Sequence, residues 1–423
     1  MRILILLLTT TSLYAQSAQS GEWLLTTTDA GLANYLRADL KFEGDKVSGS
    51  SGTLTYTGTL SNGRVELESK RADGSTVTKY SGTLTTNEMK GQAVRGGTPL
   101  EWTARRMKEK PAVPQTHHFT PTVFHNYFSS TVAPALTIFP GDSVESWSVD
   151  AGGTDAQGVR RNPGGNPLTG PFYVEGAIPG DTLVVRFTRI RLNRDTAFSG
   201  QRVAASALNP VYFSSQQNGS RAQPDAAWTL DLQGGSAKLT NPSEKLRDYR
   251  VPLRPMLGCV GVAPPQGQSF RSGYPGTFGG NMDYNQLVEG TTVYLPVNHP
   301  GALLFVGDGH AAQGDGELTG NALETSMDWT FSVDVIRGRS TGQPRLENAE
   351  FWMASGIANS LPEALQAATT NLSQWLEQDY KLDASEIGVV LGTAIHYEVA
   401  ELVDPQIHVV AKVAKSVLAS IPQ

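Results

Sequence analysis

Hydrophobic and polar residues alternate with a period of two along most of the first hundred residues. The alternation is clearest over residues 52–58, 65–68 and 80–85. Such alternation is typical of strands with one buried face. Two pairs that favour hairpin turns separate the runs: Asn62-Gly63 and Asp73-Gly74. We therefore predict a small all-β domain over residues 21–107, a barrel or sandwich of about five to seven strands.

Tryptophan residues mark both ends of this domain. Trp23 lies near its start and Trp102 near its end, where they could close one sheet against another. The domain shows no cluster of histidines, cysteines or carboxylates, so we assign it no chemistry. Residues 108–116, polar and with two prolines, follow as a predicted linker.

The second predicted domain, residues 117–423, begins as a β domain and changes character near its end. Apolar runs over 182–187 and 291–297 predict buried strands. From Ser360 onward the apolar residues fall at helical spacing. Ser360 is a candidate N-cap, and Glu363 would complete a capping box.

Two more helices are predicted after this one. The pattern indicates a helix that starts at Asp383 or Ser385 and runs to about Val399, and a third from Val409 to Leu418. The fold class predicted for the whole chain is mainly β, with helices confined to the C-terminal part.

Composition excludes several classes of protein. The chain has 44 glycines and 24 prolines without a Gly-X-Y period, so it is not collagen-like. Only 17% of residues are charged and heptads are absent, which argues against a coiled coil or helical bundle. The net charge of −6 lacks the basic footprint of a nucleic-acid-binding protein. A single cysteine excludes an intramolecular disulfide and a thiolate zinc cage.

The N-terminus has the pattern of a secretory signal peptide. Arg2 supplies a positive charge, residues 3–8 form a short apolar segment, and cleavage after Ala15 fits a small-residue site. The apolar segment is far shorter than the roughly 20 residues that cross a membrane. We predict a signal peptide over residues 1–15, no membrane span, and export to the periplasm or the exterior.

The densest group of chemically active residues lies in the glycine-rich segment 307–317. Asp308 and His310 are two residues apart, so on an extended chain both side chains point to one side. A carboxylate and an imidazole that converge in this way are typical ligands of a divalent metal. Gln313 and Glu317 offer further oxygen ligands or a general base. The alternative is a solvated turn, because Asp-Gly pairs favour turns.

Other candidate residues stand in separate short motifs. Glu175 lies at a strand end, Asp150 follows another predicted strand, and Asn281 with Asp283 follows a glycine pair. Each could instead be a polar residue in a turn. His125 could line a pocket.

Cys259 has two interpretations. It could be a nucleophile, which requires a thiolate. Its apolar neighbours instead indicate a small buried hydrophobic residue.

Four motifs in order resemble the acetamidase/formamidase family: residues 170–177, 258–264, 279–283 and 307–317. The resemblance covers about residues 117–420 and includes a closing motif at 402–405. It implies hydrolysis of a small carboxamide to a carboxylate and ammonia. It also implies a jelly-roll-like β-sandwich with C-terminal α structure, which often assembles as a homo-oligomer. The signal peptide and the N-terminal β domain are additions to the family pattern.

The resemblance and the residue types together give a specific hypothesis. Matching motif positions favour Asp308, His310, Asp283 and Glu175 as site residues. We expect a metal-dependent amidase that takes its ligands from Asp308, His310 and Asp150 or Asp283. Either Glu175 or Glu317 would act as general base. The predicted substrate pocket consists of His125, Asn281 and Gln313. Zinc is the expected metal, with calcium or manganese as alternatives.

Two rival functions remain open at this point. The glycine- and aspartate-rich loops could hold structural calcium in a secreted β-sandwich that binds a surface ligand without catalysis. Alternatively, Cys259 could be the nucleophile of a metal-independent amidase.

Overall fold

The computed structural model describes residues 19–217 and 224–422, which form two compact units. Unit 1 is Met1–Lys110 and unit 2 is Pro111–Gln423, so the division lies inside the predicted linker 108–116. The predicted signal peptide, residues 1–15, lies outside the described residues. None of the helices in the described residues is long and apolar enough to cross a membrane.

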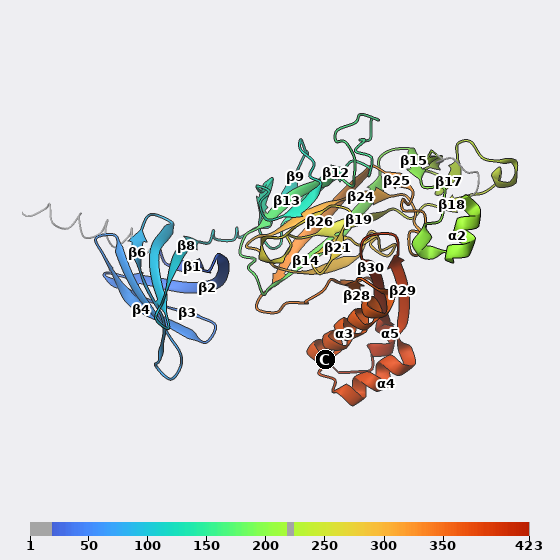
Figure 1. The fold of residues 1–423 in the computed structure, drawn as a ribbon. Helices are drawn as coiled ribbons and strands as arrows, with labels where there is room; N and C mark the ends of the chain where they lie inside the picture. The colour runs from blue at the N-terminus through green and yellow to red at the C-terminus, as the bar shows by residue number, and fades with distance from the viewer. Residues whose placement is uncertain (1–18, 218–223, 423) are drawn as a thin grey trace, which may run out of the picture. The chain divides into compact units, whose positions relative to one another are not determined.

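The described part of unit 1 is a closed barrel of antiparallel strands in chain order (Figure 1). Its eight strands are β1 (Gly21–Asp29), β2 (Leu32–Glu43), β3 (Lys46–Ser51), β4 (Leu54–Ser61), β5 (Arg64–Lys70), β6 (Thr76–Leu84), β7 (Glu88–Arg95) and β8 (Thr98–Arg106). The prediction of five to seven strands was therefore too low, although β2 itself alternates, with Ala38, Leu40 and Phe42 buried. The barrel closes because its first strand, β1, pairs with its last strand, β8.

Alternate residues of the barrel strands fill its interior. Trp23 and Trp102 are both buried there, and Tyr80 packs edge-on against Trp102 with ring centroids 5.2 Å apart. The Asn62-Gly63 pair turns β4 into β5 with positive φ at both residues, as a tight hairpin requires. The predicted all-β character of this domain is confirmed.

Unit 2 contains two large sheets in its described residues. In the first, nine strands follow one another in space: β18 (Val251–Pro252), β17 (Ser236–Leu239), β16 (Ala226–Asp231), β15 (Thr196–Ser199), β25 (Glu324–Thr325), β24 (Ala302–His310), β19 (Met256–Gly261), β22 (Gly279–Asn281) and β21 (Pro275–Gly276). Two further strands join through β24: β13 (Leu168–Val174) and, beside it, β11 (Leu136–Ile138).

The second sheet supplies the other main layer. Its order is β29 (His396–Glu401), β30 (Ile407–Ala414), β28 (Phe351–Ala358), β27 (Arg345–Glu347), β23 (Thr292–Pro296), β14 (Thr182–Leu192), β26 (Met327–Ile336), β12 (Ser143–Ser148) and β9 (Thr116–His118). A small separate ribbon pairs β10 (Tyr127–Ser129) with β20 (Ser269–Arg271). Phe172 of the first sheet meets Trp329 and Phe331 of the second edge-on, within one continuous apolar core. The predicted mainly-β fold class is confirmed.

Helices are confined to a few places in the described residues: α2 (Pro210–Gln217), α3 (Leu361–Tyr380), α4 (Ala384–Ala394) and α5 (Lys415–Leu418). Helix α3 begins as predicted, because the Ser360 hydroxyl accepts the backbone N–H of Glu363. Its apolar face packs on β28 and β30.

The two later helix predictions were partly wrong. Helix α4 ends at Ala394, and residues 396–401 form strand β29. Residues 407–414 form strand β30, and only Lys415–Leu418 is helical. The valines of this segment suit a strand that pairs on both sides, with β28 and β29.

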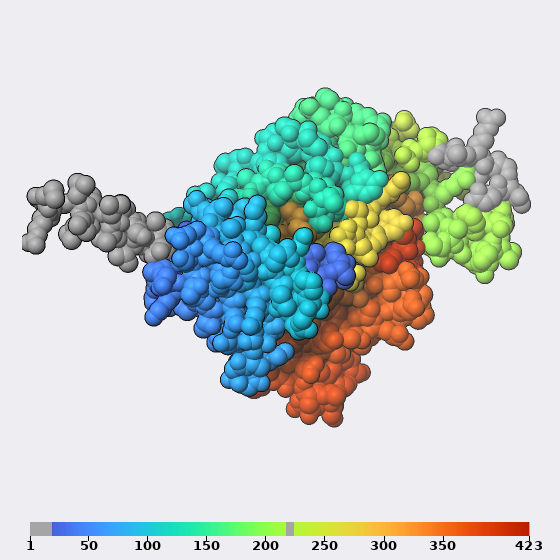
Figure 2. Space-filling view, turned by 60° about the vertical axis from the view of Figure 1, so that its left-hand side comes forward, coloured from blue at the N-terminus to red at the C-terminus, as the bar shows by residue number. Residues whose placement is uncertain are grey.

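The C-terminal tail is tied to the glycine-rich segment after β24. Gly316 and Glu401 form an isolated parallel bridge. Nδ1 of His408 donates a hydrogen bond to the carbonyl oxygen of Met282 at 2.7 Å. Figure 2 shows yellow atoms of the segment around residue 270 next to orange-red atoms of the C-terminal part at the surface. Two parts of the chain more than a hundred residues apart in sequence therefore meet beside the end of β24.

Candidate active site and metal centre

The candidate site lies at the end of strand β24, inside the first sheet. Asp308 and His310 are both buried, and Nε2 of His310 lies 3.4 Å from Oδ1 of Asp308. Neighbouring strands cover both sides, because β19 pairs with β24 on one edge while β13 and β25 pair with it on the other. The two-residue spacing has thus brought a carboxylate and an imidazole together in a buried place.

Five more carboxylates surround this pair, and we call the whole group the acidic centre. It consists of Asp283, Asp308, His310, Glu317, Glu324, Glu401 and Asp404. Three overlapping sets have ligand atoms within 4.8 Å of one another: Asp283 with Asp308 and His310, His310 with Glu317 and Glu324, and Asp283 with Glu401 and Asp404. The residues come from β24, the loop that follows it, β25, the loop after β22, the end of β29 and the loop after β29.

Asn281 joins the carboxylates of the acidic centre. Its side-chain nitrogen donates to Asp283 at 2.6 Å and to Asp404 at 2.7 Å. Its oxygen accepts a hydrogen bond from Asn166 at 3.1 Å. The same Asn166 nitrogen lies 3.3 Å from Oδ2 of Asp308. These two amides hold three carboxylates in fixed positions.

Gly258 leaves the space that two of these carboxylates occupy. A Cβ atom at this position would overlap with Oδ1 of Asp283 and Oδ2 of Asp308. Any larger residue would therefore push the two carboxylates apart. Glycine is therefore required at position 258 for a steric reason, because a side chain there would displace two carboxylates of the acidic centre.

The hydrogen bonds of Gln313 fix which nitrogen of His310 carries the proton. The amide nitrogen of Gln313 donates to the backbone carbonyl of Asp283 and lies 3.4 Å from that of Ala400. Its oxygen must then face Nδ1 of His310, 2.9 Å away. Nδ1 therefore donates, and Nε2 is directed at the carboxylates of Asp308 and Glu324. Although burial opposes it, these two carboxylates raise the pKa of His310 well above its usual range. An imidazole oriented by a hydrogen bond to its other nitrogen is the usual arrangement of a metal ligand.

The acidic centre carries more carboxylates than positive groups, and this raises the pKa values of several of its carboxyl groups. Burial, with the carboxylates of Glu317 and Asp308, raises the pKa of Asp283 well above its usual range. Burial also raises the pKa of Glu324 to about 7, although His310 opposes it. The pKa of Asp404 rises to about 8 through burial and the nearby Glu401. These carboxylates need either protons or a cation to remain buried together.

Unpartnered atoms are consistent with a cation in the acidic centre. Five of its buried polar atoms make no hydrogen bond: Oδ1 of Asp283, Oδ1 of Asp308, Nε2 of His310, Oε2 of Glu324 and Oε2 of Glu401. Of these, Nε2 of His310 lies at ion-pair distance from Oε2 of Glu324 (3.2 Å) and from Oδ1 of Asp308 (3.4 Å), and among the described residues the Asp283 and Glu401 oxygens have no such contact. Buried polar atoms without partners cost free energy, and they are rare in folded proteins. The set combines carboxylate oxygens with one imidazole nitrogen, which suits a divalent metal such as zinc.

Backbone strain is concentrated in the same place. Asn166, Asp283, Asp308 and Glu317 have positive φ angles, and they are four of the ten such residues other than glycine in the described chain. Left-handed conformations cost such residues about 1–3 kcal/mol and tend to cluster at functional sites.

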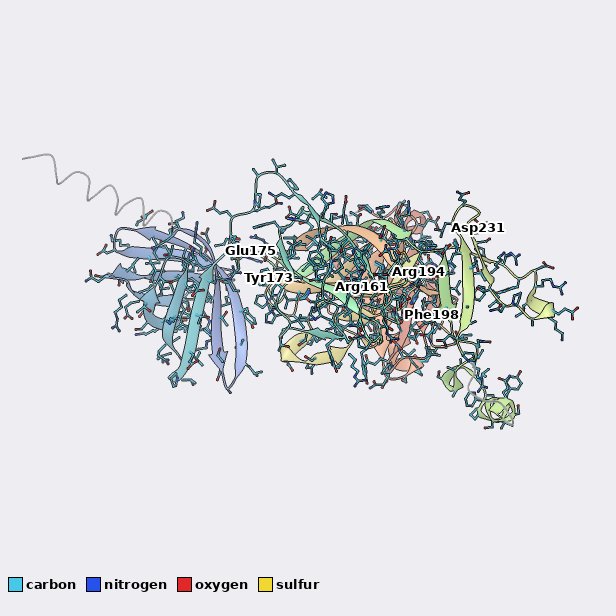
Figure 3. The ribbon with its side chains drawn as sticks, turned by 90° about the horizontal axis from the view of Figure 1, so that it is seen from above. Arg161, Tyr173, Glu175, Arg194, Phe198 and Asp231 are labelled. Atoms are coloured by element: carbon cyan, nitrogen blue, oxygen red, sulfur yellow. The ribbon has the colours of Figure 1, made fainter. Side chains whose placement is uncertain are left out.

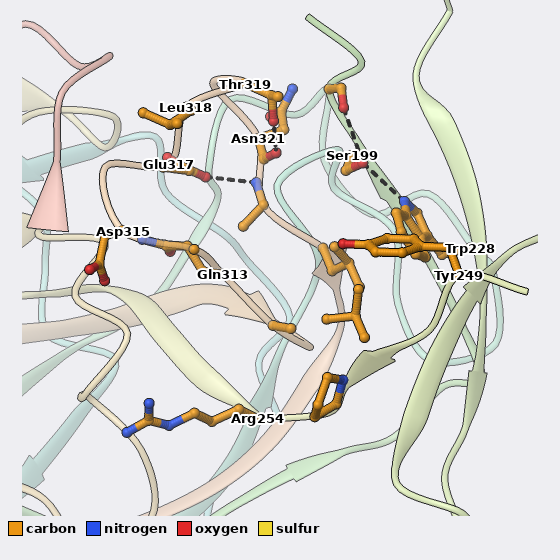
Figure 4. Close-up of a pocket in the computed structure, with 17 residues that line it drawn as sticks. Ser199, Trp228, Tyr249, Arg254, Gln313, Asp315, Glu317, Leu318, Thr319 and Asn321 are labelled. Carbon is orange, nitrogen blue, oxygen red and sulfur yellow. Dashed lines mark hydrogen bonds between the residues drawn. The ribbon is translucent and has the colours of Figure 1, made fainter. Parts of the chain in front are cut away.

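A pocket of about 600 Å³ opens beside the acidic centre (Figure 4). Gln313 and Glu317 line it, so these two residues connect the pocket to the buried carboxylates. The indole of Trp228 and the ring of Tyr249 form its opposite wall, and Trp228 donates to the hydroxyl of Ser199 at 3.0 Å. The pocket provides a route by which a small molecule could reach the site.

Known proteins share both the sequence and the fold of this region. The family model for the Acetamidase/Formamidase family matches residues 266–376. The crystal structure of acetamidase from Yersinia enterocolitica superposes with a TM-score of 0.61 and 29% identity, over 73% of this chain and 94% of that one. The chain is thus similar in sequence and in fold to members of the acetamidase/formamidase family. The similarity agrees with the resemblance that the sequence motifs indicated.

Two further proteins are similar to this chain in sequence. A protein of Schizosaccharomyces pombe that is named as a formamidase is 54% identical over 60 residues, which is 14% of this chain. The acetamidase of Mycolicibacterium smegmatis is 26% identical over 268 residues, or 51% of this chain. The aligned regions span 15% and 66% of the lengths of these two relatives.

Six of the site residues suggested by the sequence come together. Asp283, Asp308, His310 and Glu317 belong to the acidic centre, Asn281 bonds to it, and Gln313 holds His310.

Asp150 lies outside the acidic centre. Its carboxylate pairs with Arg194 at 2.6 Å and accepts the backbone N–H of Thr154 at 2.8 Å. This carboxylate is therefore already neutralised by a guanidinium, so the structure does not bring it to the candidate metal ligands.

Glu175 and His125 also lie apart from it. Tyr173 pairs with Ala302 at the beginning of β24, so Glu175 lies near the opposite end of this strand from Asp308. Figure 3 shows Glu175 well separated from Arg194. His125 lines a different hollow, beside Phe119 and Gly170.

Glu324, Glu401 and Asp404 are members of the acidic centre that the sequence did not single out. Glu324 stands alone in its segment, and it reaches the site only because β25 pairs with the end of β24. Asp404 lies in the closing motif 402–405. This motif indicated the family resemblance, but it did not indicate a role for Asp404. The bridge between Gly316 and Glu401 brings Glu401, and with it the nearby Asp404, to the acidic centre.

The environment of Cys259 argues against a nucleophilic role. The thiol is fully buried and donates to Oδ1 of Asn281 at 2.6 Å. Burial raises its pKa well above the usual range, and the carboxylates of Asp308 and Asp283 raise it further. A catalytic cysteine needs the opposite shift, toward the thiolate.

Proposed function

We propose that this chain is an exported, metal-dependent amidohydrolase that cleaves the C–N bond of a linear carboxamide to a carboxylate and ammonia. The observation that carries the proposal is the set of five buried polar atoms without a hydrogen bond in the acidic centre, in a chain similar to this family. Export follows only from the signal-peptide pattern of residues 1–15. A homo-oligomer is the expected assembly, by analogy with the family.

Asp308 and His310 would hold the metal, together with Asp283. These three residues form one of the sets with ligand atoms within 4.8 Å, and each has an unpartnered atom. A divalent cation bound there supplies a Lewis acid, which polarises the amide carbonyl and makes water more acidic. Zinc is the favoured ion because the set includes an imidazole nitrogen, while calcium and manganese remain alternatives.

Glu317 is the residue best placed to move the proton. It belongs to a set with His310 and also lines the pocket, so it faces both the site and the space for substrate. Burial raises its pKa well above the usual range, against the opposing effect of His310. We assign Glu317 to accept the proton of the attacking water and to return it to the leaving nitrogen.

The size of the pocket favours an amide substrate larger than formamide or acetamide. Its volume of about 600 Å³ lies within the roughly 300–1,000 Å³ range of pockets that hold drug-sized ligands. Trp228 and Tyr249 offer apolar surface for an acyl group of some size, while Gln313 and Glu317 lie at its polar end.

The alternative of a calcium-bound binding module without catalysis is less well supported. Similarity to the acetamidase/formamidase family favours the amidase, and an imidazole oriented by Gln313 is a poor ligand for calcium, which prefers oxygen ligands.

Ammonia release from a panel of amides tests the proposal. The full chain is stripped of metal, reloaded with zinc, and assayed with formamide, acetamide and amides of longer or aromatic acids. We expect activity only in the reloaded protein, and a loss of about 1,000-fold in His310→Ala together with its bound zinc. His396→Ala removes an exposed histidine and is the matched control, with full activity expected. Full activity of the metal-free protein, or of His310→Ala, would overturn the proposal.

A further inference from the structure

A second charged cavity lies in unit 2, between the second sheet and helix α3. Its volume is about 100 Å³, and its walls come from the second sheet, the segment after β26 and helix α3. Arg345, Trp352 and Thr341 all line it. None of these residues belongs to the acidic centre or to the pocket beside it.

Three buried polar atoms of these lining residues have no hydrogen-bond partner. They are Nη2 of Arg345, Nε1 of Trp352 and Oγ1 of Thr341. The first two can only donate, and the threonine hydroxyl can also donate. A cavity surrounded by unpartnered donors needs an acceptor to satisfy them.

Neutral side chains hold the guanidinium of Arg345. Its Nε donates to the amide oxygen of Asn371 at 2.8 Å, and Nη1 donates to that of Gln378 at 3.1 Å. The group also stacks over Trp375 at 5.2 Å. Asn371 is fixed in turn, because its nitrogen donates to the carbonyl oxygens of Pro344 and Ser355. These contacts orient Arg345 but do not neutralise its charge.

The charges around the cavity leave a surplus of one positive charge. Among the described lining residues, the charged ones are Arg339, Arg345 and Asp379. Asp379 pairs with Arg339, and its other oxygen accepts the indole N–H of Trp375 at 2.8 Å. Burial and the nearby Arg339 lower the pKa of Arg345 to about 10, so it remains charged at neutral pH.

We propose that this cavity is a binding site for a small monocarboxylate anion of the size of formate or acetate. One negative charge would balance the surplus, and two carboxylate oxygens can accept from the guanidinium, indole and hydroxyl donors. The volume corresponds to about three water molecules at roughly 30 Å³ each, which suits so small an anion and excludes a nucleotide or a sugar phosphate. The site stands apart from the proposed catalytic one and does not depend on it.

Thermal unfolding of the full chain with acetate tests this proposal. Sodium acetate is titrated against sodium chloride at equal ionic strength, and binding is followed by calorimetry on the same samples. We expect a saturable rise of a few degrees in the unfolding midpoint with acetate or formate, and none with chloride. Phosphate is included as a second oxyanion, and we expect at least tenfold weaker binding because of its size and second charge.

Variants locate the binding site. Arg345→Met should weaken acetate binding by at least tenfold, and Trp352→Phe and Thr341→Val should weaken it severalfold each. Trp352→Phe and Thr341→Val keep side chains of similar shape, so they should fold. Acetate binding can therefore still be measured in them if Arg345→Met fails to fold. His310→Ala should bind acetate as the unaltered chain does, which separates this cavity from product binding at the acidic centre. Absence of saturable binding, unchanged binding in Trp352→Phe and Thr341→Val, or loss of binding in His310→Ala would overturn the proposal.

Discussion

The acidic centre and the cavity around Arg345 are two buried, incompletely satisfied polar regions of opposite charge. In the acidic centre, six carboxylates surround one imidazole, and most of the unpartnered atoms are acceptors. Around the cavity, two guanidiniums face one carboxylate, and the unpartnered atoms are donors. The sign of the surplus in each region indicates the charge of the ligand that it can hold, a cation in one and an anion in the other.

The two regions also differ in how the backbone supports them. Three acids of the acidic centre and the neighbouring Asn166 have positive φ, and Gly258 makes room for two carboxylates. The positive-φ residues other than glycine do not include any that the cavity argument uses. Backbone strain that persists is expected where geometry must be exact enough for catalysis. The difference supports a catalytic role for the first region and simple binding for the second.

The largest effect should come from Glu317→Gln. This change keeps the shape of the side chain but removes its capacity to accept a proton. We expect kcat for amide hydrolysis to fall by about 100- to 10,000-fold, while bound zinc stays within twofold of the unaltered protein. Ammonia release and elemental analysis on the same sample measure both quantities. Normal activity would show that the proton acceptor is another residue of the acidic centre.

Gly258→Ala should disturb the metal without changing any charged group. The new methyl group would overlap with the carboxylates of Asp283 and Asp308, so we expect zinc affinity to fall on the order of 100-fold. Gly273→Ala is the matched control, since a Cβ there meets nothing within 4 Å. A competition titration with a zinc-binding dye measures both variants, and equal affinities would contradict the steric account.

A smaller effect is expected from Gln313→Leu, which removes the amide that orients His310. We expect about a tenfold loss of zinc affinity, because Nδ1 of His310 loses its partner. Gln313→Glu restores the acceptor for Nδ1 but lacks the amide donor to the Asp283 carbonyl, so it should recover part of the affinity. Gln313 is a positioning residue in this account. If Gln313→Glu recovers no zinc binding, Gln313 does not orient His310 for the metal.

The smallest effect should come from Trp352→Phe in the absence of acetate. The change removes an unpartnered indole N–H while it keeps an aromatic ring in the cavity wall. We expect the free energy of unfolding to change by less than about 1 kcal/mol, since no hydrogen bond is lost. Denaturant unfolding measures it. A much larger loss would mean that the indole has a protein partner, and it would weaken the parallel between the two regions.

Local sequence signals predicted part of this structure well. The hairpin pair Asn62-Gly63, the capping residue Ser360 and the spacing of Asp308 and His310 act over a few residues, so the sequence alone reveals their geometry. The valines near residue 410 were assigned to a helix because both apolar faces of strand β30 are covered, which removes the period of two.

The complete site could not be predicted because distant segments form it. Glu324 and Glu401 join through strand pairing and a single bridge to Gly316, and neither contact leaves a local pattern in the sequence. Asp150 and Glu175 looked equivalent to Asp308 as acids near strand ends. Only the three-dimensional structure shows Asp150 paired with Arg194 and Glu175 at the opposite end of β24.

Ammonia release from an amide by metal-free protein, measured as zinc is added back, tests the central claim most directly. The account predicts that activity is absent without metal, rises in proportion to the zinc bound, and levels off when binding is complete. Activity that is full before zinc is added, or that stays absent on every amide after zinc has bound, would contradict it.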